Sequence, residues 1–254
     1  MLLAVDVGNT QTHVGAFDGV DLLGSWRLAT RGDSTADELA LALAGSLQFR
    51  GLEWDDVTGL IVSTVVPRLG PEYERLCESH LTASFLLVGP AARTGMPILI
   101  DNPHELGSDR LVNAVSAYER IGGRCLSVDF GTSINVDAVS ADGEYLGGVI
   151  APGLEVSIEA LSLRAAKLPR IQLEEPEVAI GRNTQSALQS GFVFGFAGLI
   201  DGIARRMLDE LGRPATVIAT GGMAAAIAPL CETVDEVDSY LTLTGLRLIW
   251  ERNR

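Results

Sequence analysis

The sequence predicts an α/β fold built from two similar halves, and two short segments carry that prediction. Residues 6–13 (DVGNTQTH) follow the apolar run LLAV, and residues 129–136 (DFGTSINV) follow RCLSV in the same way. In both places an apolar run ends on an Asp-x-Gly turn with a Thr close behind, and a hairpin pattern follows. This repetition predicts an internal duplication, with two α/β lobes and a cleft between them.

Coincidence is the alternative, because a single Asp-x-Gly after a strand is most often an ordinary tight turn. The surroundings of the two turns favour duplication instead. The turn FDG at residues 17–19 and the turn ADG at residues 141–143 occupy corresponding places after the two segments.

The first half reads as strands, helices and turns in a regular order. Short apolar or alternating runs punctuated by Gly predict three antiparallel strands. A Ser/Thr/Asp cap before apolar residues at helical spacing predicts the first helix. The expected strands are 2–8, 12–17, 22–28, 57–66 and 84–88, and the expected helices are 34–47, 68–81 and about 106–119.

The same order begins again after the Gly pair at residues 122–123. The expected strands are 124–131, 133–139, 145–150 and 216–222, and the expected helices are about 153–165, 184–211 and 241–252. The strand at 216–222 ends on two glycines, which suits a flat nucleoside lying against backbone, although a plain strand-to-helix turn is the alternative.

Composition and charge exclude some partners. The chain has 254 residues, of which 47% are hydrophobic, and 19 Lys and Arg against 33 Asp and Glu give a net charge of −14. No basic run tracks a phosphate backbone, so no nucleic acid partner is expected. The apolar stretch 191–200 is shorter than the roughly 20 residues of a membrane span, which predicts a buried helix and no membrane partner. The N-terminus does not resemble a signal peptide, so a cytoplasmic location is expected.

The two turns suit phosphate binding. An Asp at the end of a buried strand is held rigidly at the edge where α/β proteins bind ligands. Gly8 and Gly131 let backbone approach a ligand, and Asn9, Thr10 and Thr132 add donors for phosphate oxygens. A nearby carboxylate could hold Mg²⁺ directly or through water.

Seven segments, taken in order over nearly the whole chain, resemble the signature blocks of type III pantothenate kinase. They are DVGNT, DNPHELGSDRLVNAVSAY, DFGT, GGVIAPGLEVSIEALSLRAAKLPRI, IGRNTQSALQSGFVFGFAGLIDGI, VIATGG and LTLTGLRLIWERN. That family belongs to the actin-like superfamily of sugar kinases and Hsp70 ATPases. The resemblance implies a duplicated actin-like (ribonuclease H-like) fold with an ATP cleft between lobes 1–120 and 121–254.

The resemblance also implies an activity. The family phosphorylates pantothenate to 4′-phosphopantothenate with ATP, a transfer to an alcohol group that begins coenzyme A biosynthesis. It is a homodimer that needs Mg²⁺ and a monovalent cation, K⁺ or NH₄⁺, and it lacks a Walker A lysine, as this chain does.

Carried over by position, the resemblance implies roles for individual residues. Asp109 would be the base that takes the proton from the pantothenate hydroxyl, Asp6 would lie near Mg²⁺, and Asp129 would bind K⁺. The residues implied in ATP binding are Asp6, Val7, Gly8, Asn9, Thr10, Gln11, Thr12, His13 and Thr132. Those implied in substrate binding are Ile100, Gly107, Ser108, Asp109, Arg110 and Thr184.

Plainer interpretations exist for several of these residues. Asp109 and Arg110 at a helix start could form a simple cap with a surface ion pair. Thr184 could be a helix N-cap, with or without a ligand contact. Asp201 is expected to cap or pair, without chemistry.

The sequence departs from the family pattern at three places. Ser133, Ile134 and Asn135 follow DFGT where the family has Ala-Thr-Thr, Ile100 replaces a Tyr, and Gln11 replaces a common Asn. A hydroxyl position thus becomes apolar, which could weaken the ATP or cation contacts. Two alternatives therefore stay open: a kinase of another small acid or sugar, and a non-catalytic accessory protein, since the resemblance extends to the Bvg accessory factors.

Overall fold

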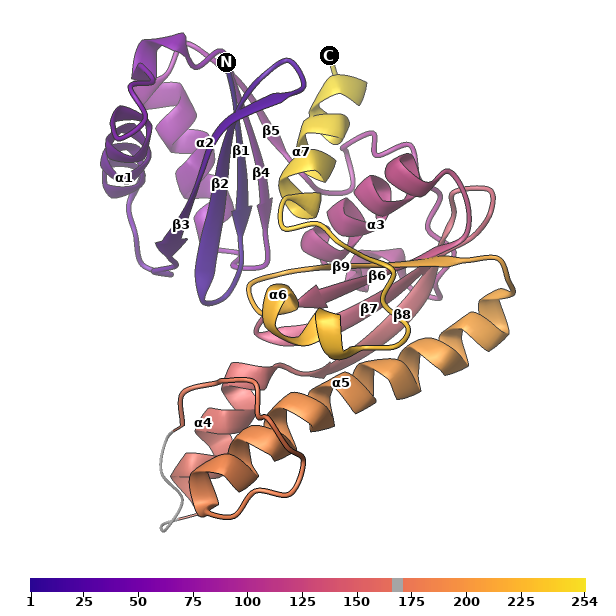
Figure 1. Ribbon diagram of the computed structural model, residues 1–254. Helices are drawn as coiled ribbons and strands as arrows, with labels where there is room; N and C mark the ends of the chain where they lie inside the picture. The colour runs from indigo at the N-terminus through magenta and orange to yellow at the C-terminus, as the bar shows by residue number, and fades with distance from the viewer. Residues whose placement is uncertain (166–170) are drawn as a thin grey trace. The chain divides into compact units, whose positions relative to one another are not determined.

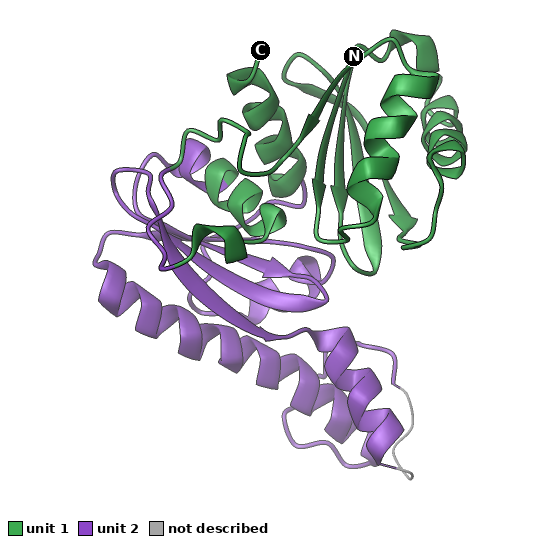
Figure 2. Ribbon diagram, turned by 180° about the vertical axis from the view of Figure 1, so that it is seen from behind, with its two compact units in different colours: residues 1–96, 102–116, 241–254 green, residues 97–101, 117–240 purple. Residues whose placement is uncertain are grey.

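The computed structural model describes residues 1–165 and 171–254 (Figure 1). The contacts divide the chain into two compact units, coloured separately in Figure 2. Unit 1 comprises Met1–Met96, Asn102–Ser116 and Leu241–Arg254, and unit 2 comprises Pro97–Asp101 and Ala117–Tyr240. This grouping differs from the expected lobes 1–120 and 121–254, because the closing helix packs with the first unit and the short segment 97–101 with the second.

Unit 1 is built on a five-stranded sheet in the order β3-β2-β1-β4-β5. The pairs β1–β2 and β2–β3 are antiparallel, while β1–β4 and β4–β5 are parallel. The three expected antiparallel strands are therefore confirmed. The strands are β1 (Leu2–Val7), β2 (Gln11–Asp18), β3 (Asp21–Ala29), β4 (Gly59–Thr64) and β5 (Ser84–Leu87).

Helices cover both faces of this sheet. On one face, α1 (Ala36–Gln48) and α2 (Leu69–His80) share a buried core with alternate residues of the strands. On the other face lies α7 (Leu241–Arg252), whose Trp250 ring would meet a Cβ at Gly59 at 2.3 Å. The expected cap of α1 is confirmed, because the Thr35 side chain accepts a hydrogen bond from Glu38 N.

Unit 2 repeats this plan with the sheet order β10-β9-β6-β7-β8. Its antiparallel pairs are β6–β7 and β7–β8, and its parallel pairs are β6–β9 and β9–β10. The helices α4 and α5 belong to this unit. The elements are β6 (Cys125–Phe130), β7 (Ser133–Val139), β8 (Tyr145–Pro152), α4 (Leu154–Arg164), α5 (Thr184–Leu211), β9 (Thr216–Thr220) and β10 (Glu236–Val237).

The duplication extends to single hydrogen bonds. Gly8 N donates to Gln11 O at 3.0 Å in the first turn, and Gly131 N donates to Ser133 O at 3.1 Å in the second. After the third strand of each unit, Thr30 N donates to Thr10 O, and Gly153 N donates to Thr132 O. The predicted fold class, a duplicated α/β fold, is thereby confirmed.

Four short elements were not expected from the sequence, besides the two-residue strand β10. They are α6 (Ala224–Ile227) and three 3-10 helices, Trp54–Asp56, Pro103–Glu105 and Ala228–Leu230. The helix α3 (Ser108–Ile121) begins in unit 1 and ends in unit 2. One quoted signature segment runs through residues 166–170, which lie outside the described residues.

The expectation of a buried helix at 191–200 is only half right. By length and composition, α5 could cross a membrane. However, it packs one face into the core of unit 2 through Val193, Ala197 and Ile200, while Phe194 is 36% exposed. A core helix of a globular unit shows this one-sided burial.

Candidate active site

A row of polar side chains crosses the sheet of unit 1 on the face opposite the α1–α2 core. Asp6 on β1 pairs in register with His13 on β2 and with Ser63 on β4. His13 in turn pairs with Arg27 on β3. Because residues directly across from each other share a face, these four side chains form one row near the ends of the strands.

His13 stays neutral in this row. The imidazole is 8% exposed. Burial, together with the nearby positive charge of Arg27, lowers the pKa of His13 to about 4. At neutral pH the ring beside Asp6 therefore carries no positive charge.

The first turn exposes a short stretch of backbone. Asn9, Thr10 and Gln11 are exposed, whereas Val7 is buried in the core and the hydroxyl of Thr12 lies 2.9 Å from that of Thr30. A Cβ at Gly8 would lie 3.0 Å from Gln11 O, so a side chain there would crowd the turn. Of the predicted ATP-binding segment, Asn9, Thr10 and Gln11 thus have the accessible side chains.

Asp109 lies in the first turn of α3, also in unit 1. Its Oδ1 accepts a hydrogen bond from Arg110 N at 2.9 Å. A Cβ at Gly107 would lie 2.5 Å from the same oxygen, so this carboxylate position requires glycine there. Burial raises the pKa of Asp109, although the hydrogen bond from Arg110 N and the Arg110 charge oppose that rise.

Unit 2 holds the second half of the predicted site. Asp129, at the end of β6, pairs in register with Asn135 on β7 and with Thr220 on β9. Gly221 follows Thr220 with a φ of +99° and packs against the Asp129 carboxylate. Thr132 lies in the exposed turn beside Gly153, which precedes α4.

Asp6 and Asp129, the two residues predicted to bind metal ions, each provide one carboxylate. Within residues 1–165 and 171–254, no group of three or more His, Cys, Asp and Glu side chains is placed to hold a metal ion. Mg²⁺ in kinase sites is commonly held by one or two carboxylates plus water and substrate phosphates, which Asp6 fits. The oxygen donors Asp129, Asn135 and Thr220 suit a hard monovalent cation.

Two further residues predicted to bind the substrate, Ile100 and Thr184, lie in unit 2 and are far apart in the sequence. Ile100 belongs to unit 2, where its side chain lies 3.6 Å from a Cβ built on Gly147. Thr184 is exposed at the start of α5. It is not the N-cap, contrary to that interpretation, because Asn183 accepts from Ser186 N at 2.9 Å and forms the cap.

The structure gives a reason for the unusual segment 133–135. Ile134 is 1% exposed and belongs to the core cluster that packs on α5. Its apolar side chain therefore serves packing, and the concern that it weakens a ligand contact does not hold for this position. Asn135, which lies on the other face, accepts a hydrogen bond from Ser133 Oγ at 3.2 Å.

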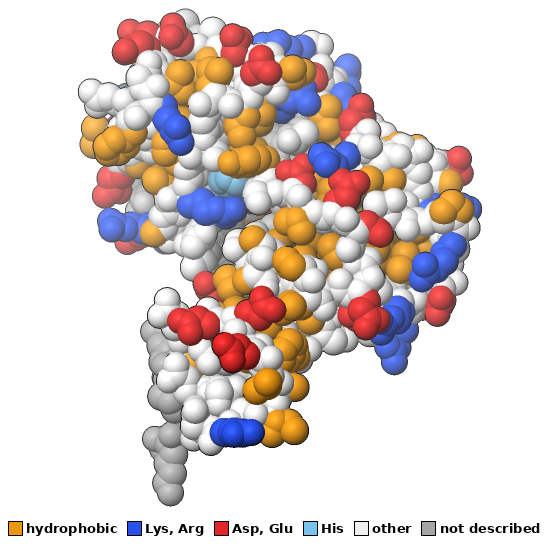
Figure 3. Space-filling model, viewed as in Figure 1, with side chains coloured by type: hydrophobic (Ala, Val, Ile, Leu, Met, Phe, Trp, Pro, Cys, Tyr) orange, Lys and Arg blue, Asp and Glu red, His pale blue; other side chains and the backbone are white. Residues whose placement is uncertain are grey.

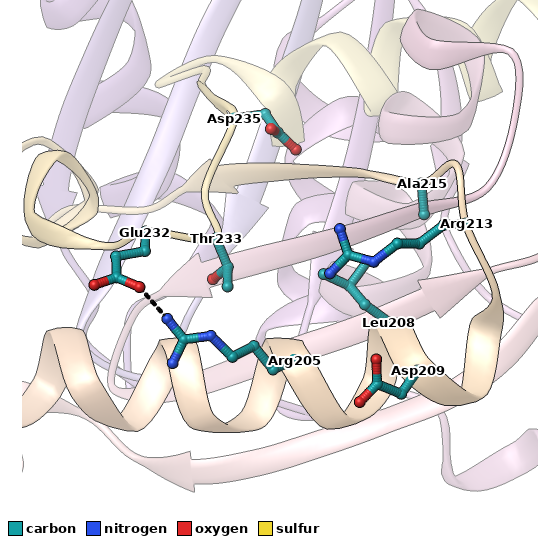
Figure 4. Close-up of a pocket in the computed structure, with 8 residues that line it drawn as sticks. All are labelled: Arg205, Leu208, Asp209, Arg213, Ala215, Glu232, Thr233 and Asp235. Carbon is teal, nitrogen blue, oxygen red and sulfur yellow. Dashed lines mark hydrogen bonds and ion pairs between the residues drawn. The ribbon is translucent and has the colours of Figure 1, made fainter.

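A polar pocket elsewhere in unit 2 contains none of the predicted residues. It lies near Ala215, before β9, whereas the predicted nucleoside segment follows the other end of that strand (Figure 4). Arg205 forms an ion pair with Glu232 across it. Asp201 holds the adjacent loop by accepting from Glu232 N and Thr233 N at 3.0 and 2.9 Å, which supports the structural role expected for it.

Sequence reasoning missed Ser63, whose hydroxyl lies 2.9 Å from that of Ser108. The signal was present as a polar residue inside the apolar run LIVSTVV. A fully buried hydroxyl needs a partner, but the sequence alone does not say which residue supplies it.

Comparisons with known proteins agree with this geometry. The family model described as type III pantothenate kinase matches residues 2–206. The type III pantothenate kinase of Myxococcus xanthus is 49% identical over 253 residues, covering 100% of this chain and 99% of that protein. The type III pantothenate kinase of Moorella thermoacetica is 46% identical over 253 residues, covering 100% of both.

Solved structures share the fold at low identity. A Baf family protein of Campylobacter jejuni has a TM-score of 0.62 at 19% identity, covering 99% of this chain and 98% of that one. The ethanolamine utilization protein EutJ of Carboxydothermus hydrogenoformans has a TM-score of 0.57 at 13% identity, covering 97% and 89%. These similarities concern the fold alone.

Proposed function

The chain belongs to the type III pantothenate kinase family, and from that premise we propose which of its residues carry out the reaction. The enzyme phosphorylates pantothenate with ATP to give 4′-phosphopantothenate, the first step of coenzyme A biosynthesis. The family match over residues 2–206 and the 49% identity over the full length of a type III pantothenate kinase support this activity. The residue roles below rest on geometry.

Asp109 is the proposed general base. Phosphoryl transfer to an alcohol needs a group that accepts the hydroxyl proton as the oxygen attacks the γ-phosphorus. A carboxyl whose pKa is raised by burial accepts that proton more readily than an exposed one. Arg110, next in sequence, carries a positive charge suited to the pantothenate carboxylate.

The exposed turns are the proposed contacts of the ATP phosphates. Asn9, Thr10 and Gln11 in unit 1 and Thr132 in unit 2 present side-chain donors beside backbone N–H groups. The chain has no Walker A lysine, so these neutral donors must be supplemented by cations at the phosphates. The glycines of residues 219–222 are the proposed support for the nucleoside.

Two cations are proposed as cofactors. Asp6 would hold Mg²⁺ together with water and phosphate oxygens, and Asp129, with Thr220 and Asn135 beside it, would hold K⁺ or NH₄⁺. When bound, these ions supply positive charge that neutralises the phosphates. Asp6 and Asp129 each contribute a carboxylate fixed at a strand end, which limits how far either ion can move.

A homodimer is proposed from exposed apolar side chains of unit 2. Leu163 on α4 is 77% exposed and Ile180, between α4 and α5, is 84% exposed. Val156, Val178 and Phe194 are also exposed. Figure 3 shows apolar side chains on the arm that contains α4 and the first half of α5. Exposed apolar side chains of this kind are typical of a protein–protein interface. We also propose a cytoplasmic location for the enzyme.

ADP release by purified protein with ATP, Mg²⁺ and pantothenate tests the proposal. We expect turnover that requires pantothenate and K⁺ and that falls when Na⁺ replaces K⁺. Turnover on another small acid or sugar exceeding that on pantothenate would overturn the acceptor assignment. Absence of turnover with every acceptor, with ATP still bound, would overturn the kinase assignment in favour of an accessory protein.

A further inference from the structure

We propose that Ser63, a buried residue of β4, is a positioning residue for Asp109 and acts through the hydroxyl of Ser108. This inference rests on the proposed role of Asp109 as the base. The three residues Ser63, Ser108 and Asp109 all belong to unit 1.

The hydrogen bonds between these residues can be oriented by counting protons. Ser63 Oγ and Ser108 Oγ are 2.9 Å apart, and Ser108 Oγ donates to Thr64 O at 3.3 Å. A serine hydroxyl has one proton to donate. Since Ser108 gives that proton to Thr64 O, Ser63 is the donor to Ser108. The residue before Asp109 is thus anchored to β4 at two consecutive positions.

Burial of the Ser63 hydroxyl in β4 would destabilise the fold if its hydrogen bond to Ser108 did not form. The exposed fraction of Ser63 is 0%, and the three residues before it in the strand, Leu60 to Val62, are apolar and fully buried. Burying a hydroxyl without a partner is unfavourable, whereas an apolar residue of similar size would need no partner. The bond to Ser108 removes that cost and places a polar contact at the start of the helix that carries Asp109.

The position of Ser63 in β4 connects the Ser63–Ser108 hydrogen bond to the proposed active site. Ser63 pairs in register with Asp6, the proposed Mg²⁺ residue on the neighbouring strand. The Ser63–Ser108 bond therefore ties the first turn of α3 to the strand end where Asp6 lies. The carboxylate of Asp109 is thereby fixed with respect to the cation residue of the same unit.

A second contact holds α3 one turn after Asp109. It should keep the helix in place when the first turn is loosened by a substitution. Thr242 Oγ1 donates to Asn113 Oδ1 at 2.7 Å, four residues after Asp109. A Cβ at Gly245 would lie 2.3 Å from Val112 O, so α7 packs directly on the α3 backbone. With this contact intact, loss of the Ser63 hydroxyl frees the first turn of α3 and leaves the helix in place.

The test compares Ser63→Ala with Ser46→Ala, a matched control. Ser46 is also buried, and its Oγ donates to Ala42 O at 2.8 Å within α1. We expect both variants to remain folded, since each removes only one buried hydroxyl. In Ser63→Ala alone we expect kcat to fall about tenfold to a hundredfold with little change in KM for ATP, because misplacing a reacting group costs rate.

The dependence of kcat on pH gives a second measurement, which would not change if Ser63 only stabilised the fold. A loosened first turn admits water to Asp109, which lowers its pKa. The acid limb of kcat in Ser63→Ala should therefore shift to lower pH, and Ser63→Thr, which keeps the hydroxyl, should restore the limb. A wild-type kcat and profile in Ser63→Ala, or an equal loss in Ser46→Ala, would overturn the inference.

Asp109→Asn separates this inference from the proposed function. If Asp109→Asn stays fully active, the base assignment fails, and the positioning role fails with it. If Asp109→Asn is inactive while Ser63→Ala behaves like the wild type, the base assignment holds and the positioning role alone fails. Ser108→Ala should lower kcat at least as much as Ser63→Ala does, because it also loses the bond to Thr64 O, and the double variant should lose no more than Ser108→Ala alone.

Discussion

Asp129 and Gly221 are packed so closely that a Cβ on the glycine would lie 2.5 Å from Asp129 Oδ1. The φ of Gly221 is +99°, a backbone conformation that L-residues rarely adopt. The end of β9 thus lies against the carboxylate at the end of β6, so the proposed nucleoside segment and the proposed K⁺ residue are in contact within unit 2.

Gly221→Ala should therefore weaken both cation and nucleotide binding. The methyl group would displace Asp129 Oδ1 and impose backbone strain of order 1–3 kcal/mol. We expect the thermal stabilisation by K⁺ and ATP together to be largely lost. Gly222→Ala is the matched control, because nothing lies within 4 Å of a Cβ there. Equal responses of the two variants to K⁺ and ATP would contradict this prediction.

His13 should make the enzyme less stable as the medium turns acidic. Its folded pKa is about 4, below the ordinary 6.5, so the unfolded chain takes up a proton first as pH falls. Stability contributed by the neutral ring is complete above about pH 6.5 and is lost by about pH 4, an effect of about 3 kcal/mol.

Urea unfolding between pH 7.5 and 4.5 measures this dependence. His13→Gln should flatten the slope of unfolding free energy against pH. An unchanged slope in His13→Gln would show that His13 is not the group responsible.

Gly245→Ala should destabilise the packing of α7 on α3. The added methyl would meet the carbonyl of Val112 at 2.3 Å, and such overpacking costs about 1–3 kcal/mol. Gly45→Ala in α1 meets nothing within 4 Å and should instead stabilise by roughly 0.5–1 kcal/mol. Calorimetric melting of the two variants checks the opposite signs, and a gain of stability in Gly245→Ala would refute the contact.

Ile180→Asp should dissociate the proposed dimer. Placing a charge in an apolar interface leaves it desolvated, which disfavours association. Light scattering after size exclusion should give the monomer mass for this variant and the dimer mass for Phe49→Asp, whose side chain on unit 1 is 88% exposed. A dimer that survives in Ile180→Asp would place the interface elsewhere.

Much of the fold followed from local pattern. The alternating apolar runs and Gly turns predicted β1, β2 and β3, and the cap sequence at Thr35 predicted α1, because these signals act over a few residues. Asp6 and Asp129 were predicted at strand ends, and both lie there.

Long-range contacts were beyond the reach of the sequence pattern. The bond between Ser63 and Ser108 joins residues 45 positions apart, and its partner choice depends on how α3 packs against β4. The inward position of Ile134 depends on the register of β7, and the cap of α5 at Asn183 rather than Thr184 depends on where the helix begins. Likewise, α7 joins unit 1 through tertiary packing that periodicity does not specify.

Pantothenate-dependent ADP release by Asp109→Asn, measured beside the wild type in K⁺ and in Na⁺, tests the central claim most directly. We predict that the variant keeps its fold and its ATP binding while kcat falls about 10²- to 10⁴-fold, the range that general base catalysis contributes. Turnover of the variant at the wild-type rate in K⁺ would contradict the assignment of Asp109 as the base.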